Sequence, residues 1–443
     1  MRLATALWFA VSLAAQDADP EPVLARAREK ILNVTHRLPR YTCLETIHRD
    51  YFEAPKPRPH KHELTAKPAP SCALVLDHPL NNLLPEGWDR VRLDVAVAGN
   101  HEIESWPGAS RFDSRRLDQI VTTGPTSTGA FGTYLIEVFE NAGAKIKFTS
   151  RHGGLLEYSF LIPRESSHYG VGAGTGFFIT GTSGSFSIDP KTADLTQLII
   201  ATDVLPPQAQ MCQAKTTIAY EHLRIGESDF LLPQSSTLET LHSDFSRTAS
   251  VTTFSACHEY SAESTLLLDD QDAAAGSEAA NSPAAPLPAG LPLSLALAAP
   301  IDSDTAAAGD LVFASVLKAV NAPHQKNVLI PKGSRVRGRI SEMKYFADPT
   351  PHFQFGLSFD HLQIGGVWTP VTMEVDRGTR REMPPSALNT VRRSSGLRTR
   401  GMVIQLPLPG SDDGGLFVFA AKSPRYLVPA GYESKWVTRE TKP

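Results

Sequence analysis

Alternating hydrophobic and polar residues predict that this chain is built mainly from β-strands. In RVRLDVAV, residues 90–97, every odd-numbered position is valine or leucine. Such alternation gives a strand one buried side and one side that faces water, as in antiparallel sheets. We therefore expect Arg90, Arg92 and Asp94 to be solvated. Similar runs predict strands at residues 41–52, 144–151, 155–163, 176–181, 185–189, 195–203, 214–223, 230–242 and 250–264.

Two segments instead repeat apolar residues at helical spacing. Residues 20–38 place Val23 and Ile31 on one stripe, and residues 127–140 show the same spacing. A curved antiparallel sheet that wraps over a helix buries the apolar surfaces of both. Residues 20–265 are therefore predicted to form a half-barrel with a concave interior.

An Ala- and Pro-rich stretch divides the chain. Residues 266–290 have no periodic apolar face and predict a flexible linker. Strand patterns resume after it, and residues 291–443 predict a small β-barrel or sandwich domain with the turn IPKG between two strands. The predicted fold class is thus mainly β (α+β): a curved antiparallel half-barrel with two helices, then a small β domain.

An arginine-rich segment interrupts the second domain at residues 376–400. It has almost no apolar pattern, so we expect a disordered, solvated loop, suited to peripheral contact with anionic membrane lipids. Its arginines are Arg377, Arg380, Arg381, Arg392, Arg393, Arg398 and Arg400. The formal net charge of the chain is only −4, which argues against nucleic acid as a partner.

The first residues, MRLATALWFAVSLAAQ, have the layout of a secretory signal peptide over residues 1–15. A charged start leads into a short apolar run and then into small residues. The run is shorter than the roughly 20 residues that a membrane-spanning helix needs. We therefore expect a periplasmic or secreted protein.

Export allows disulfides, and the chain has four cysteines. Pairing Cys43 with Cys72 would close a Pro-rich excursion from a strand, which makes it the preferred bridge. Cys212 with Cys257 then follows by elimination. If residues 211–258 form a plain three-strand meander, however, these two cysteines lie at its opposite ends, beyond the roughly 7 Å between Cα atoms that a disulfide spans.

The remaining motifs favour no catalytic chemistry. The glycine-rich stretch YGVGAGTGFF, residues 169–178, lacks the GxGxxG spacing of a dinucleotide loop and precedes a strand pattern. It is expected to be a flexible crossing between strands and a lip at the mouth of the half-barrel. His60 and His62 lie in a Pro- and Lys-rich loop with no third metal ligand. No GxSxG nucleophile elbow occurs. We predict no catalytic residue, no cofactor, no metal and no enzyme.

Several stretches together resemble a group of uncharacterised secreted proteins, mostly acidobacterial, whose first domain is similar to the LolA/LolB-like half-barrel. They are PRYTCLETIHRD (39–50), LDVAVAGNHEIESW (93–106), STGAFGTYLIEVF (127–139), EYSFLIPRESSHY (157–169), and residues 184–203 and 214–233. In the second domain, PIDSDTAAAGDLV (300–312) and VLIPKGSRVRGRI (328–340) resemble the β-module of the TrbI/VirB10 secretion-channel family.

The resemblance to LolA-like proteins implies a concave face that holds an acyl chain. We therefore expect an exported, non-enzymatic envelope protein that binds a lipid or the acyl chain of a lipoprotein. The alternative is a structural module that docks onto an envelope protein partner and binds no small molecule. Which of the two applies depends on whether the half-barrel interior is open or packed.

Overall fold

The computed structural model describes residues 19–37, 40–55, 71–98, 101–109, 112, 117–173, 176–259, 287–348, 350–376, 403–406, 414–421 and 423–440. The fold is mainly β, as predicted. The predicted signal peptide, most of the linker, the pair His60 and His62 and the seven arginines of residues 376–400 lie outside the described residues. No helix among the residues described is long and apolar enough to cross a membrane.

Ten antiparallel strands form the sheet of the first unit, residues 19–259. Their spatial order is β3–β2–β1–β12–β11–β10–β9–β8–β5–β4. The strands are β1 (Tyr41–Glu53), β2 (Leu84–Ala98), β3 (His101–Ser105), β4 (Lys145–His152), β5 (Leu155–Ile162), β8 (Thr182–Ile188), β9 (Leu195–Thr202), β10 (Met211–Ile225), β11 (Ser228–His242) and β12 (Arg247–Glu259). A separate hairpin consists of β6 (Gly170–Ala173) and β7 (Gly176–Ile179).

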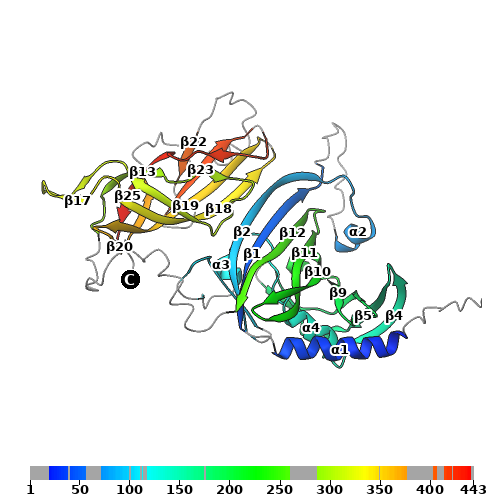
Figure 1. Cartoon of the computed structure of the whole chain (residues 1–443). Coiled ribbons are helices and arrows are strands. Elements are labelled where there is room, and N and C mark those ends of the chain that lie inside the picture. The colour runs from blue at the N-terminus through cyan, green and yellow to red at the C-terminus, as the bar shows by residue number, and fades with distance from the viewer. Residues whose placement is uncertain are drawn as a thin grey trace, which may run out of the picture.

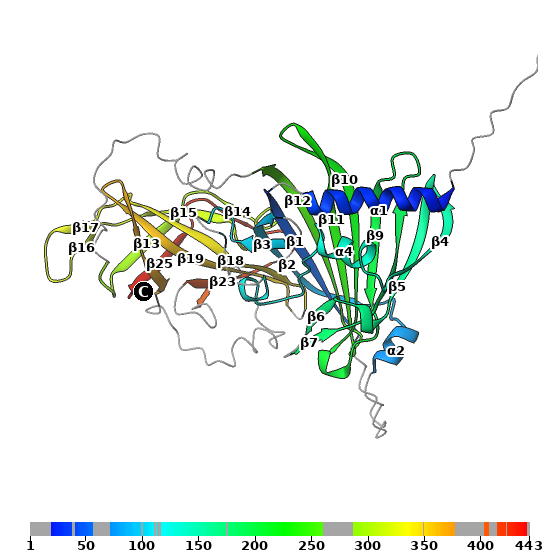
Figure 2. The same cartoon turned by 90° about the horizontal axis from the view of Figure 1, so that it is seen from below.

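Two helices pack against the concave side of this sheet. Helix α1 (Pro20–Arg37) runs across the strands, with α4 (Thr133–Phe139) beside it (Figures 1 and 2). The predicted stripe of α1 is confirmed, because Val23 and Ile31 are buried against apolar side chains of β5, β8 and β9. The described residues also contain two short helices that the sequence analysis did not predict, α2 (Cys72–Asp77) and α3 (Leu117–Ile120).

Helix α4 begins later than the sequence predicted. Residues 127–132 are an irregular segment, because the Glu102 carboxylate accepts the backbone N–H groups of Gly129 at 2.7 Å and Phe131 at 2.9 Å. Gly129 has a φ of 105°, a conformation that interrupts a helix. The predicted apolar stripe is nevertheless buried, including Phe131 and Val138.

The second unit, residues 287–440, is also built from antiparallel strands. The pairing runs β21–β25–β13–β15–β18–β19–β23–β22, and β20 pairs with β19. These strands are β13 (Pro292–Leu297), β15 (Leu311–Val316), β18 (Arg335–Phe346), β19 (His352–Ile364), β20 (Val367–Pro370), β21 (Thr372–Val375), β22 (Val403–Leu406), β23 (Gly415–Ala420) and β25 (Glu433–Arg439). Two small pairs flank them: β14 (Ile301–Asp302) with β24 (Leu427–Val428), and β16 (Val320–Asn321) with β17 (Val328–Ile330). An aromatic core that includes Phe355, Phe417 and Trp436 holds this unit together.

The two units share one continuous sheet. Strand β2 pairs with β1 along its length, and at its start it also pairs with β18, where Trp88 lies opposite Tyr345. Trp88 packs edge-on against Phe353, with ring centroids 5.8 Å apart. The junction is therefore formed by strand pairing and aromatic packing between β2 and the second unit.

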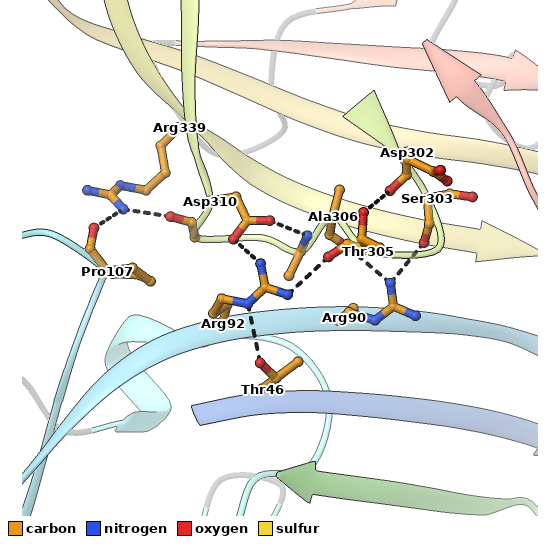
Figure 3. A network of polar contacts seen from close by, with 12 residues as sticks. Thr46, Arg90, Arg92, Pro107, Asp302, Ser303, Thr305, Ala306, Asp310 and Arg339 are labelled. Carbon is orange, nitrogen blue, oxygen red and sulfur yellow. Dashed lines mark hydrogen bonds and ion pairs between the residues drawn. The ribbon is translucent and has the colours of Figure 1, made fainter. Parts of the chain in front are cut away.

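The polar side of β2 does not face water, so the prediction for Arg90, Arg92 and Asp94 is wrong. Figure 3 shows Arg90 and Arg92 reaching the loop at residues 303–310 of the second unit. Arg90 donates to the carbonyl of Ser303 at 2.8 Å, and Arg92 pairs with Asp310 at 2.5 Å. The alternation predicted the strand correctly, but its polar side is an interface because a second sheet covers it.

The disulfides also differ from the predicted pairs. Cys43 is bonded to Cys257, and Cys72 to Cys212, whereas we expected Cys43 with Cys72 and Cys212 with Cys257. Strand β1 pairs with β12, which brings the Cα atoms of Cys43 and Cys257 to 4.0 Å. Cys72 begins α2, which packs on β10, the strand of Cys212. Distant strands thus meet, and the pairs that look local in sequence do not form.

Candidate ligand-binding cleft

The concave interior of the first unit is packed in one half and open in the other. Beneath α1 and α4 the side chains form a closed apolar core. Away from α1 the interior opens into a cleft of about 1850 Å³, lined by the end of β1, by β3, by residues 117–134 and by parts of β6, β7, β10, β11 and β12. The concave surface of the sheet therefore packs against the apolar core in one half and lines the cleft in the other.

Small polar side chains of β11 and β12 form the back wall of the cleft. Thr240 and Thr248 line it and are both almost fully buried. Ser250 follows on the same face of β12, and its Oγ has no hydrogen-bond partner among the described residues. Buried hydroxyls without partners cost stability, so this wall has hydrogen-bonding capacity that the described chain does not use.

Apolar side chains form a strip along the cleft. They come from the helix and loop at residues 117–121, from the β6–β7 hairpin and from β10 and β11. The strip comprises Leu117, Val121, Val171, Phe177, Met211 and Leu238. Phe177 is 70% exposed, which is unusual for so large an apolar residue outside a binding surface.

The glycine-rich stretch YGVGAGTGFF forms part of this strip. It folds into the β6–β7 hairpin at the end of the first unit away from α1 (Figure 2), and Gly170, Gly172 and Gly176 line the cleft. A Cβ on Gly170 would come within 2.1 Å of the ring of Phe177, and a Cβ on Gly176 within 2.7 Å of the ring of Phe178. Gly170 gives room for the Phe177 ring to cross the facing strand, and Gly176 for the Phe178 ring to lie along its own strand; a phosphate-binding loop would not require either.

Two tyrosines close the side of the cleft next to α4. The rings of Tyr134 and Tyr169 stack with centroids 5.5 Å apart, and both line the cleft. The Tyr134 hydroxyl lies 2.8 Å from Ser127 Oγ. Burial raises the pKa of both phenols, so both stay neutral and serve as hydrogen-bonding or packing groups.

Three glutamates lie at the β1–β3 side of the interior; Glu45 and Glu104 are buried and Glu102 is half-buried. Glu102 and Glu104 line the cleft from β3, and Glu45 lies behind them on β1. Burial and then the charge of Glu102 raise the pKa of Glu104 to about 7. Burial, with the charge of Glu104 next, raises the pKa of Glu45 well above its ordinary range. At acidic pH these two carboxyls are therefore neutral, and at alkaline pH Glu104 is charged inside the protein.

The described lining of the cleft carries no lysine or arginine. The buried Arg49 lies behind the wall, and its guanidinium is taken up by a bidentate pair with Asp89 at 2.6 and 2.9 Å. Tyr51, which lines the cleft, donates a third hydrogen bond to Asp89 at 2.9 Å. The ionisable side chains of the lining, apart from tyrosines, are Glu102, Glu104, Asp118, Asp244 and two histidines, His168 and His242.

The sequence analysis named no residue of this cleft except the glycines. The alternation on β3 and β12 was too short or too polar to distinguish a cleft wall from a solvated strand face. Among the described residues, no group of three or more His, Cys, Asp or Glu side chains is arranged to hold a metal. Comparisons with models of protein families, with curated proteins and with solved structures found no match for this chain.

Proposed function

We propose that this protein is an exported, non-enzymatic envelope protein that binds a lipid or the acyl chain of a lipoprotein in the cleft of its first unit. The observation that supports the proposal most is the open half of the concave face, about 1850 Å³ in volume and bordered by an apolar strip. Pockets of this kind, with mixed apolar and polar walls, are typical of ligand sites.

Three further features support the proposal. The two disulfides, Cys43–Cys257 and Cys72–Cys212, fit a protein that folds in an oxidising compartment such as the periplasm. The exposed ring of Phe177 at the cleft offers apolar surface to an incoming chain. The arginine-rich residues 376–400 would add attraction to anionic membranes, from which such a ligand could be collected.

A blocking substitution tests the proposal. Leu238 lines the cleft from β11, so Leu238→Trp should narrow the cleft beside the apolar strip and weaken binding of a neutral fluorescent lipid probe. Val251 on β12 lies on the opposite face and is 40% exposed, so Val251→Trp is the matched control and should bind normally. Native mass spectrometry of protein purified from an envelope extract should show an added lipid mass in the wild type.

The alternative function, docking onto an envelope protein without a small-molecule ligand, would be favoured by the opposite results. The wild type would then show a ligand-free mass and, after crosslinking in cells, a stable protein partner. The two tryptophan variants would bind the probe equally.

A further inference from the structure

The charge of the cleft walls indicates which end group a ligand can carry. The carboxylates of Glu102, Glu104 and Asp244 line the cleft, and its described lining contains no lysine or arginine. An anionic group that entered this space would lose its hydration without gaining a countercharge, and such burial is costly. A positively charged group would meet carboxylates instead.

Glu104 is the carboxylate best placed to receive such a charge. It is 5% exposed and lines the cleft, and none of the described side chains forms an ion pair or hydrogen bond with it. Glu102 differs, because its two oxygens already accept the backbone N–H groups of Gly129 and Phe131. The one donor to Glu104 among the described residues is its own backbone N–H. A buried carboxylate that faces a cavity with so few donors can accept a hydrogen bond from a ligand.

A second carboxyl lies behind Glu104. Glu45 on β1 and Glu104 on β3 flank β2 on the same face, since Glu45 lies opposite Leu93 and Glu104 opposite Val95. Glu45 is 3% exposed and accepts no hydrogen bond from any described side chain. The two carboxyls therefore make the potential at this end of the cleft negative whenever either one is ionised.

We propose that the cleft selects amphiphiles whose polar end carries a positively charged nitrogen, with Glu104 as the carboxylate that binds this group and the apolar strip as the surface that binds the hydrocarbon. This inference rests on the proposed ligand-binding function and adds the class of ligand. A cation at Glu104 would turn an unpaired buried carboxylate into a charge-assisted hydrogen bond.

The ionisation of Glu104 makes the selectivity depend on pH. Its pKa of about 7 in the ligand-free protein means that the carboxyl is mostly protonated at about pH 5 to 6 and mostly ionised at about pH 8. The titratable groups whose charges act on it are Glu102 from β3 and Glu45 from β1, and both are acids. Raising the pH should therefore strengthen binding of a cation and leave binding of a neutral amphiphile nearly unchanged.

Three probes with the same hydrocarbon tail test the inference: octylammonium, octanol and octanoate, measured by displacement of a neutral fluorescent probe from the full-length protein. At about pH 8 octylammonium should bind about tenfold more tightly than octanoate. In Glu104→Gln this preference should fall to about threefold or less while octanol binding is kept. Glu227→Gln, in the exposed turn between β10 and β11, is the control and should behave as the wild type.

The outcomes separate this inference from the function on which it rests. If none of the three probes binds, the proposed ligand-binding function fails. If octanol binds but octanoate binds as well as octylammonium, the function stands and the charge preference is refuted. Should Glu104→Gln fail to fold, the wild type still decides: octylammonium affinity must rise about tenfold between about pH 5.5 and about pH 8, and a flat profile refutes the inference.

Discussion

The buried carboxyl of Glu104 predicts how the stability of this protein depends on pH. Its pKa is about 7 in the folded state, against an ordinary value of 4.5, because burial and the charge of Glu102 disfavour ionisation. Below about pH 4.5 both the folded and the unfolded chain hold this proton, so the group contributes nothing. Between about 4.5 and 7 only the folded chain holds it, and the free energy of unfolding falls as the pH rises.

The size of this effect follows from the shift. A difference of about 2.5 pKa units at 1.36 kcal/mol each gives a penalty of about 3 kcal/mol that is complete above about pH 7. Glu104→Gln removes the penalty, so relative to the wild type the variant should gain about 2 to 3 kcal/mol in unfolding free energy between about pH 5 and about pH 8. Loss of the charge at residue 104 also lowers the pKa of Glu45, and this change further raises the unfolding free energy of the variant relative to the wild type.

The assay is urea unfolding with intact disulfides, followed by far-ultraviolet circular dichroism at both pH values for wild type, Glu104→Gln and the exposed control Glu227→Gln. Because each variant is compared with the wild type at the same pH, titrating groups that do not interact with Glu104 cancel, and Glu45 adds to the difference in the same direction. The reasoning is refuted if the difference in unfolding free energy between the wild type and Glu104→Gln does not change with pH. Glu104 would then be hydrated or paired in the folded protein.

Three further predictions concern the rest of the fold. Cys43→Ser, which opens a loop of 214 residues, should lower the free energy of unfolding by about 4 kcal/mol in chemical denaturation, and addition of reductant should lower that of the wild type further, because it also opens Cys72–Cys212; a variant as stable as the oxidised wild type would contradict this. Arg92→Met and Asp310→Asn should each cost about 1 to 3 kcal/mol and together less than their sum; additive costs in this double-mutant cycle would show that the pair does not stabilise the junction. Gly170→Val should displace the ring that crosses it and change the release rate of a neutral probe in stopped-flow measurements, whereas Gly172→Val, whose Cβ would have no neighbour within 4 Å, should release it at the wild-type rate.

The cleft shows the limit of sequence reasoning at a site. The spacing of the glycine-rich stretch argued against a phosphate loop, but it predicted a flexible crossing between strands and not the β6–β7 hairpin that the stretch forms. Glu104 gave no such signal. It stands next to Ile103 in a short strand that pairs with β2, and residues 117–134 line the same cleft. Burial of a single carboxyl depends on surfaces that come from distant parts of the chain.

Local pattern by itself determined the elements of this protein: the mainly β class, the stripe of α1, the alternation of β2 and the turns between neighbouring strands. These features follow from interactions within a few residues, where side-chain direction alternates or repeats in a fixed way. Only the tertiary structure decided which strands meet. The pairing of β1 with β12 set both the disulfide of Cys43 and the width of the concave face, and the pairing of β2 with β18 turned a polar strand face into an interface. Such contacts join residues far apart in sequence, and no local pattern records which distant partner a strand edge will find.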